Sequence, residues 1–184
     1  MNNSIAAIIL TKNEETDIVR CIRSVKEWVQ RIVIVDSGST DRTCELAAAE
    51  GAEVVKHEPF IDYAKQFNWA IDNLDITTTW VFRLDADEVV TPELRKELEK
   101  KLECHATDDV SGFMMRYKVH FLGRYLRHGG FYPFLKITIF KKCSLLLLGG
   151  LPDGIPQGAL PRRIHGCVAH ASLLRYQGDN ETDG

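Results

Sequence analysis

The chain has 184 residues, of which 45% are hydrophobic, and its formal net charge at pH 7 is −3. These values are those of an ordinary water-soluble protein that can bury a core within one domain, and no apolar run approaches the length of a membrane span. The five cysteines form an odd set without a CxxC pair, which indicates free thiols in a reducing compartment and predicts a cytoplasmic location. The apolar run at residues 5–10 is too short for a signal peptide, so no export is expected.

The first half of the chain alternates segments with the patterns of strands and helices. Apolar or β-branched runs predict strands over residues 4–10, 31–35, 52–56 and 80–84, and apolar residues at helical spacing predict helices over residues 15–29, 41–50 and 63–74. Thr40 or Asp41 is expected to cap the second helix. This alternation predicts an α/β fold, with a mostly parallel sheet flanked by helices on both faces.

The later segments are expected to extend this sheet. Thr91 and Pro92 begin a predicted helix that continues to Leu102. Residues 112–121 and 134–140 have the pattern of strands and are expected to form a hairpin-like addition to the sheet. After Leu148, glycine and proline residues predict loops.

Two carboxylates follow the fourth predicted strand, in the sequence Leu84-Asp85-Ala-Asp87-Glu88. In an extended backbone Asp85 and Asp87 would project to the same face and could bind one hard cation, Mg²⁺ or Mn²⁺, which then neutralises a diphosphate leaving group. The alternative interpretation is that both residues only end the strand and cap the helix that starts at Thr91.

Three polar clusters are expected to meet at one edge of the sheet. They lie at residues 11–14, 36–41 and 85–88, each at the carboxyl end of a predicted parallel strand. Ligands of open α/β sheets bind at this edge. The convergence of the three clusters therefore predicts one binding crevice.

With these residues, the chain resembles family 2 glycosyltransferases of the GT-A fold. The matching stretches are residues 9–14, 35–41 and 84–88, and the segments 60–70 and 121–130 are similar to bacterial glucosyltransferases of the lipopolysaccharide inner core. The resemblance implies a nucleotide-sugar donor, UDP-glucose, and a lipopolysaccharide, lipid-linked or other cell-surface glycan acceptor. It implies a donor-binding domain over residues 1–148 and, over residues 149–184, a loop-rich acceptor-side segment with a disordered tail and an altered or shortened ending. No nucleic-acid partner is expected.

The resemblance also implies individual site residues. Thr11 and Glu14 would line the nucleoside pocket, Asp36 would accept a hydrogen bond from the base, and Asp85 and Asp87 would hold the metal. The full predicted donor-binding set is Thr11, Asn13, Glu14, Asp36, Ser37, Lys65, Asn68, Asp85, Ala86 and Asp87. An alternative for Asp36 is an Asx turn without ligand contact.

The implied reaction is inverting and needs a general base for the acceptor hydroxyl. Asp153 is the only carboxylate between Asp109 and Asp179, so it is the candidate base, although it lies in a Pro-Asp-Gly turn that needs no catalytic explanation. Two alternatives remain open. One is a nucleotide-sugar-binding module with little catalysis. The other is a sugar-phosphate nucleotidyltransferase, which is disfavoured because the loop at residues 11–15 lacks glycine and carries two acids.

Basic and aromatic residues are concentrated in one segment. Residues 116–142 contain seven Lys and Arg residues and no acid, whereas residues 1–115 contain 22 acidic and 13 basic residues. The segment is therefore expected to make peripheral contact with the inner face of the cytoplasmic membrane. The alternative is that its aromatic residues belong to the core and its cations form a solvated rim.

Overall fold

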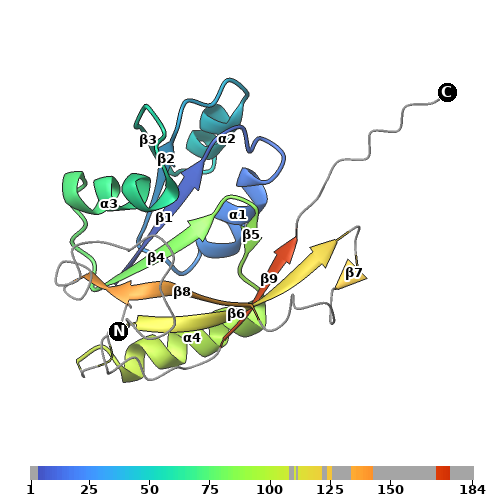
Figure 1. The fold of residues 1–184 in the computed structure, drawn as a ribbon. Coiled ribbons are helices and arrows are strands. Elements are labelled where there is room, and N and C mark those ends of the chain that lie inside the picture. Colours follow the sequence, from blue (N-terminus) through green and yellow to red (C-terminus); the bar gives the residue numbers. More distant parts are fainter. Residues whose placement is uncertain are drawn as a thin grey trace.

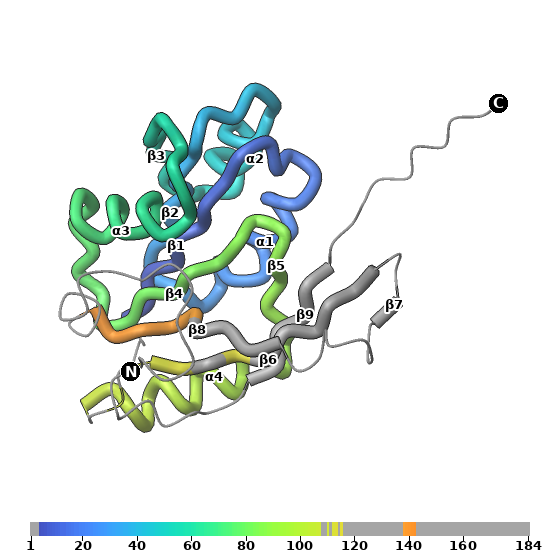
Figure 2. Tube along the Cα trace, viewed as in Figure 1, coloured from blue at the N-terminus to red at the C-terminus, as the bar shows by residue number. Residues whose placement is uncertain are grey.

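A computed structural model describes residues 4–107, 110, 112–121, 124–125, 134–142 and 169–174. Within them, nine strands form one sheet, with the order β3-β2-β1-β4-β8-β6-β9-β5 and with β7 paired to β6 (Figure 1). The colouring along the trace in Figure 2 shows that the strands up to β4, from residues 5–85, lie together on one side of this sheet.

The half of the sheet nearest the N-terminus is parallel, as predicted. Its strands, in sheet order, are β3 (Glu53–Lys56), β2 (Arg31–Asp36), β1 (Ile5–Thr11) and β4 (Trp80–Asp85). All the strand pairs among them are parallel. Every residue of β1 is buried, which agrees with the continuous apolar run that predicted a central strand.

The later strands are added mainly in antiparallel fashion. β8 (Phe134–Lys141) pairs with β4, and β6 (Gly112–Phe121) pairs with β8, so the predicted hairpin-like addition is confirmed. β7 (Arg124–Tyr125) pairs with the end of β6.

Three strands, β5, β7 and β9, were not predicted from the sequence. β5 (Glu88–Val89) follows the acidic cluster, and β9 (Ala169–Leu174) lies between β5 and β6 in the sheet. β9 lies within residues 149–184, which were expected to be rich in loops, and the rest of that segment lies outside the described residues. β9 is stabilised as a strand by its pairing with β6 and β5. Such pairing cannot be predicted from a short segment that has no strong periodicity of its own.

Helices cover both faces of the sheet, as predicted. The helices are α1 (Ile18–Val25), α2 (Thr43–Ala49), α3 (Tyr63–Asn73) and α4 (Pro92–Cys104). Buried residues of α1, α2 and α4 belong to one core cluster, and those of α3 belong to the cluster on the opposite face. Alternation along the strands divides their side chains between the two clusters.

The helix boundaries follow local hydrogen bonds more closely than the apolar pattern. α4 starts at Pro92, close to the predicted start, and the Leu94 N–H donates to Thr91 Oγ1 over 3.2 Å at its N-terminus. The expected cap of α2 was wrong, because Arg42 occupies the cap position. Asp41 instead accepts the Thr43 N–H over 3.0 Å, in the manner of an Asx turn. α1 is shorter than residues 15–29, since turns replace its expected ends.

Candidate functional site

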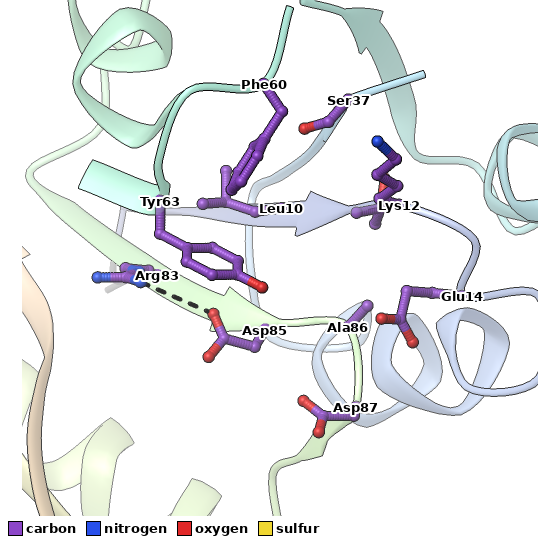
Figure 3. Close-up of a pocket in the computed structure, with 11 residues that line it drawn as sticks. Leu10, Lys12, Glu14, Ser37, Phe60, Tyr63, Arg83, Asp85, Ala86 and Asp87 are labelled. Atoms are coloured by element: carbon purple, nitrogen blue, oxygen red, sulfur yellow. Dashed lines mark ion pairs between the residues drawn. The ribbon is translucent and has the colours of Figure 1, made fainter. Parts of the chain in front are cut away.

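A pocket of about 250 Å³ lies at the carboxyl ends of β1, β2 and β4 (Figure 3). All three predicted polar clusters contribute to its walls. Its lining residues are Leu10, Thr11, Lys12, Glu14, Ser37, Phe60, Tyr63, Arg83, Asp85, Ala86 and Asp87. Six of the predicted donor-binding residues therefore line it, namely Thr11, Glu14, Ser37, Asp85, Ala86 and Asp87.

The loop after β1 is held in place by the loop after β2. Asn13 has a positive φ of 57°, and its Oδ1 accepts the Thr40 N–H over 2.8 Å. The Asn13 N–H donates to Ser39 Oγ over 2.9 Å, and the Glu14 N–H donates to Thr43 Oγ1 over 2.7 Å. Asn13 is not among the lining residues, so its visible role is to fix the loop that presents Thr11 and Glu14.

Asp36 is fully buried, and all its acceptor capacity is used within the protein. Its Oδ1 accepts from the hydroxyls of Thr11 and Ser39, and its Oδ2 accepts the N–H groups of Gly38 and Ser39 over 3.0 and 2.9 Å. A carboxylate has about four acceptor positions. The Asx-turn interpretation therefore describes this side chain, and the base contact expected of Asp36 stays a prediction.

Hydrogen bonding to Asp36 gives a prediction for stability against pH. Burial raises the pKa of Asp36, but the bonds from Ser39 and Thr11 outweigh burial, and the net pKa is lowered. A lowered folded-state pKa adds stability above the unfolded value of about 3.9, and this stability is lost as the pH falls through the folded value. Asp36→Asn should cost about 1–3 kcal/mol at pH 7, because an amide NH₂ would face the N–H and O–H donors.

Urea denaturation at pH 7 and at pH 3 measures this effect. The free energy of unfolding of Asp36→Asn should change less between these two pH values than that of the wild type. Asp72→Asn, which alters an exposed carboxylate on α3, serves as the matched control. If the free energy of unfolding depends on pH equally in the wild type and in Asp36→Asn, the pKa of Asp36 is not lowered in the folded protein.

The acidic cluster lies in a turn. β4 ends at Asp85, Ala86 and Asp87 form the turn, and β5 begins at Glu88. The alternation rule that placed Asp85 and Asp87 on one face of an extended strand therefore does not apply, since the strand ends between them. Figure 3 shows both side chains reaching the same pocket from this turn. The capping alternative is wrong, because α4 is capped by Thr91.

Side chains from α1 and β5 support the acidic turn. Glu88 is buried, and its Oε2 accepts the Asp85 N–H over 3.2 Å. Ser24 Oγ accepts the Val90 N–H over 3.1 Å, and Cys21 Sγ lies 3.6 Å from the Asp85 carbonyl oxygen. Burial raises the pKa of the Cys21 thiol, and nearby carboxylates, Glu88 foremost, raise it further. The neutral thiol can thus donate to that carbonyl.

Two predicted residues of α3 do not line the pocket. Lys65 and Asn68 are absent from its walls. The Lys65 N–H caps the helix by donating to Asp62 Oδ1 over 2.7 Å, and its ammonium lies 3.2 Å from Asp62 Oδ2. Their contact with a nucleotide stays a prediction.

Gln66, which was not predicted, connects α3 to the pocket wall. It is buried, and its Nε2 donates to Ser37 Oγ over 3.0 Å and to the His57 carbonyl over 2.9 Å. Its Oε1 lies 2.8 Å from His57 Nδ1, and the His57 ring stacks on Trp69 with centroids 4.0 Å apart. The available signal was a polar residue at a buried position of an amphipathic helix.

Five residues of the pocket wall were not among the predicted site residues, namely Leu10, Lys12, Phe60, Tyr63 and Arg83. Phe60 and Tyr63 meet edge to face with their ring centroids 5.2 Å apart, and both are exposed. Large exposed aromatic side chains beside a polar pocket provide an apolar wall for a ligand. For Arg83, the signal available in the sequence was a charged residue within an otherwise apolar strand.

The carboxylate groups of the pocket suit a hard divalent cation. Asp85 and Asp87 supply carboxylate oxygens, which Mg²⁺ and Mn²⁺ prefer. The described residues contain no group of three or more His, Cys, Asp or Glu side chains that could hold a metal. Two carboxylates would leave the remaining coordination positions for diphosphate oxygens and water, as is common for Mg²⁺. Asp153, the candidate base, lies outside the described residues.

Comparison with known proteins gives the family. The sequence profile of glycosyl transferase family 2 matches residues 6–169. The chain belongs to this family. This family 2 chain is 36% identical over 116 residues to an uncharacterised glycosyltransferase of Rickettsia conorii, in a match that covers 63% of the chain and 40% of that relative. It is 32% identical over 183 residues to the lipopolysaccharide core biosynthesis glycosyltransferase LpsC of Rhizobium meliloti, covering 94% of the chain and 63% of LpsC.

Solved structures with the same fold support the assignment of the family 2 chain to the GT-A class. One is glucosyl-3-phosphoglycerate synthase of Mycobacterium tuberculosis, crystallised with Mn²⁺ and UDP-glucose, with a TM-score of 0.52, 23% identity, and coverage of 62% of this chain and 44% of that one. Another is S. aureus TarS, with a TM-score of 0.57, 19% identity, and coverage of 79% and 49%. The predicted resemblance and fold are thereby confirmed.

Proposed function

We propose that this family 2 chain binds a UDP-linked sugar, UDP-glucose, and transfers the sugar with inversion to a lipopolysaccharide or other cell-surface glycan. The observation that carries the proposal is that Asp85 and Asp87 share one pocket with Thr11, Glu14 and Ser37 at the carboxyl ends of parallel strands. The chain spans 40% of the length of its relative in R. conorii and 63% of LpsC. The activity of a whole transferase is therefore part of the proposal.

The pocket supplies distinct chemistry for each part of the donor. A bound divalent cation would neutralise the diphosphate as it leaves. Asp85 and Asp87 would hold that cation, and the hydroxyls of Thr11 and Ser37 would bond the nucleoside. The rings of Phe60 and Tyr63 would cover an apolar face of the ligand. The neighbour from M. tuberculosis, crystallised with Mn²⁺ and UDP-glucose, supports this choice of donor and metal.

The acceptor proposal rests on LpsC, whose name refers to lipopolysaccharide core biosynthesis. Such an acceptor would be reached at the inner face of the cytoplasmic membrane. None of the helices in the described part of the chain combines the length and apolar character needed to cross a bilayer. Peripheral contact through residues 116–142 stays a prediction. Phe140 is buried, which agrees with the core alternative for the aromatic residues. Lys141 is also buried, with its ammonium 5.3 Å from the Trp80 ring centroid, so this cation belongs neither to a solvated rim nor to a membrane-facing surface.

Isothermal titration calorimetry tests the donor proposal. UDP-glucose should bind in the presence of Mn²⁺ and should bind far more weakly in EDTA, because the diphosphate and the two carboxylates repel each other without a cation. ADP-glucose and GDP-mannose are the matched controls for the base and should bind more weakly. Equal affinity with Mn²⁺ and with EDTA would contradict the proposal.

A nucleotide-sugar-binding module with little catalysis is the second candidate. It is favoured by the location of the pocket, because the described residues that line it all fall between residues 10 and 87, well before the candidate base in the sequence. A transfer assay beside the titration separates the two candidates. The nucleotidyltransferase alternative is not supported by the family match.

A further inference from the structure

Arg83 is a charged residue within an apolar strand. β4 has the sequence Trp-Val-Phe-Arg-Leu-Asp, and the other residues before Asp85 are buried apolar side chains. Removing a guanidinium from water costs free energy unless it gains hydrogen bonds and a partner charge. Its position in β4 therefore points to an interaction that an aliphatic residue could not make.

The side chain of Arg83 lies beside Asp85 without forming a hydrogen bond to it. Alternation along β4 places both residues on the face of the sheet that α3 covers. The guanidinium carbon of Arg83 lies 5.8 Å from the centroid of the Phe67 ring. Its Nη2 lies 3.9 Å from Asp85 Oδ1, which is an ion-pair distance longer than a hydrogen bond. The ring of Phe67 thus holds the guanidinium near Asp85, while its donors can still reach another group.

At least one N–H group of Arg83 has no hydrogen-bond acceptor among the described residues. Its Nε is buried and has no hydrogen-bond partner among the residues that the structure describes. Buried polar groups in folded proteins are nearly always hydrogen-bonded. Arg83 lines the pocket, and Figure 3 places Asp85 between Arg83 and Asp87. The planar guanidinium is suited to binding two oxygens of a phosphate at once.

We propose that Arg83 binds the diphosphate of the donor, on the side of Asp85 away from Asp87. The inference rests on the proposed function, since it requires a nucleotide diphosphate in this pocket. The walls contain three carboxylates, Glu14, Asp85 and Asp87, and two cations, Lys12 and Arg83. A diphosphate adds further negative charge. Arg83 would neutralise part of that charge from a fixed position, because its guanidinium lies over the Phe67 ring and its side chain is only 17% exposed.

The test separates metal binding from nucleotide binding. Three titrations are made with the wild type, Arg83→Gln and Arg83→Lys. The first uses Mn²⁺ alone, and the other two use UDP or UDP-glucose at saturating Mn²⁺. Arg83→Gln should bind UDP and UDP-glucose about 10- to 100-fold more weakly, as expected for losing hydrogen bonds to a charged group. It should bind Mn²⁺ alone as tightly as the wild type or more tightly, because a positive charge beside Asp85 is removed. Arg83→Lys should fall between, since it keeps the charge without the planar fork.

The control is Arg95→Gln, which makes the same change at an Arg–Glu99 pair on the surface of α4. It should leave all three affinities unchanged. If the wild type binds no UDP with Mn²⁺, the proposed function fails. If the wild type binds UDP and Arg83→Gln binds it equally well, only the role of Arg83 is overturned.

Two further outcomes would also overturn that role. A loss of affinity for UDP-glucose but not for UDP would assign Arg83 to the sugar. A parallel loss of Mn²⁺ and UDP binding would indicate a packing defect. If Arg83→Gln is unstable, Arg83→Met keeps the contact with Phe67, and undiminished UDP affinity of a folded Arg83→Met protein would contradict the inference.

Discussion

Asp87→Asn should strongly reduce metal-assisted transfer and leave the fold intact. Asp87 lines the pocket from a turn at the end of β4 and is only partly buried. Asparagine keeps the shape of the side chain but removes the negative charge that attracts the cation. We expect the rate of sugar transfer from UDP-glucose with Mn²⁺ to fall by about 10²–10³-fold, the range seen when one group that stabilises developing charge is removed.

Thermal unfolding without metal supplies the second measurement for Asp87→Asn. Asp85 and Glu88 flank the turn that contains Asp87, so removing the Asp87 charge from beside these like charges should leave the melting temperature unchanged or slightly higher. Asp72→Asn on α3 is the control for both measurements. A large fall in the melting temperature of metal-free Asp87→Asn would show that this carboxylate is a structural part of the turn.

Asp153→Ala should remove the transfer activity of this chain while donor affinity stays at the wild-type level. A general base contributes typically 10²–10⁴-fold to such a reaction, and Asp153 is the predicted base. We expect the wild type itself to bind UDP-glucose well and to transfer weakly, since Asp153 is the only carboxylate between Asp109 and Asp179 and the sequence Pro-Asp-Gly around it predicts a turn that needs no catalytic explanation. The donor pocket should be unaffected because its walls come from residues 10–87.

Release of UDP in the presence of an acceptor, measured beside calorimetry with UDP-glucose, tests Asp153→Ala. Asp179→Ala, at the next carboxylate along the sequence, is the control and should keep the wild-type rate. Robust turnover by Asp153→Ala would place the base elsewhere. Loss of donor affinity in this variant would instead show that residues beyond the described pocket contribute to nucleotide binding.

The parallel half of the fold could be predicted from the sequence because its signals are local and strong. The run from Ile5 to Leu10 is apolar throughout, and it forms a strand buried on both faces. β9 could not be predicted in the same way, since its register is set by β6 and β5, which lie far from it in the sequence. Pairing between distant segments leaves little trace in the composition of either segment.

The residues of the candidate site divide in a similar manner. The acidic turn was visible as a motif, whereas the positions of Arg83, Phe60 and Tyr63 in the same pocket follow only from the packing of α3 against the sheet. The hydrogen bonds that Asp36 accepts also depend on the three-dimensional arrangement of the chain. Its bond from Thr11 joins residues 25 apart in the sequence, and no local pattern shows that such a bond consumes acceptor positions that a nucleobase would need.

The pairing of β5 with β9 has a consequence for the order of folding. β5 directly follows the acidic turn, and its partner, with Glu88 opposite Leu173 and Val89 opposite Ser172, comes from almost half a chain length later. Such a contact has a high contact order and forms late, since a long loop must close first. During synthesis the strands β1 to β4 can therefore assemble before the far side of the acidic turn gains its partner. The nascent chain would acquire the nucleoside side of the pocket first and complete the metal side only after residues 169–174 emerge from the ribosome.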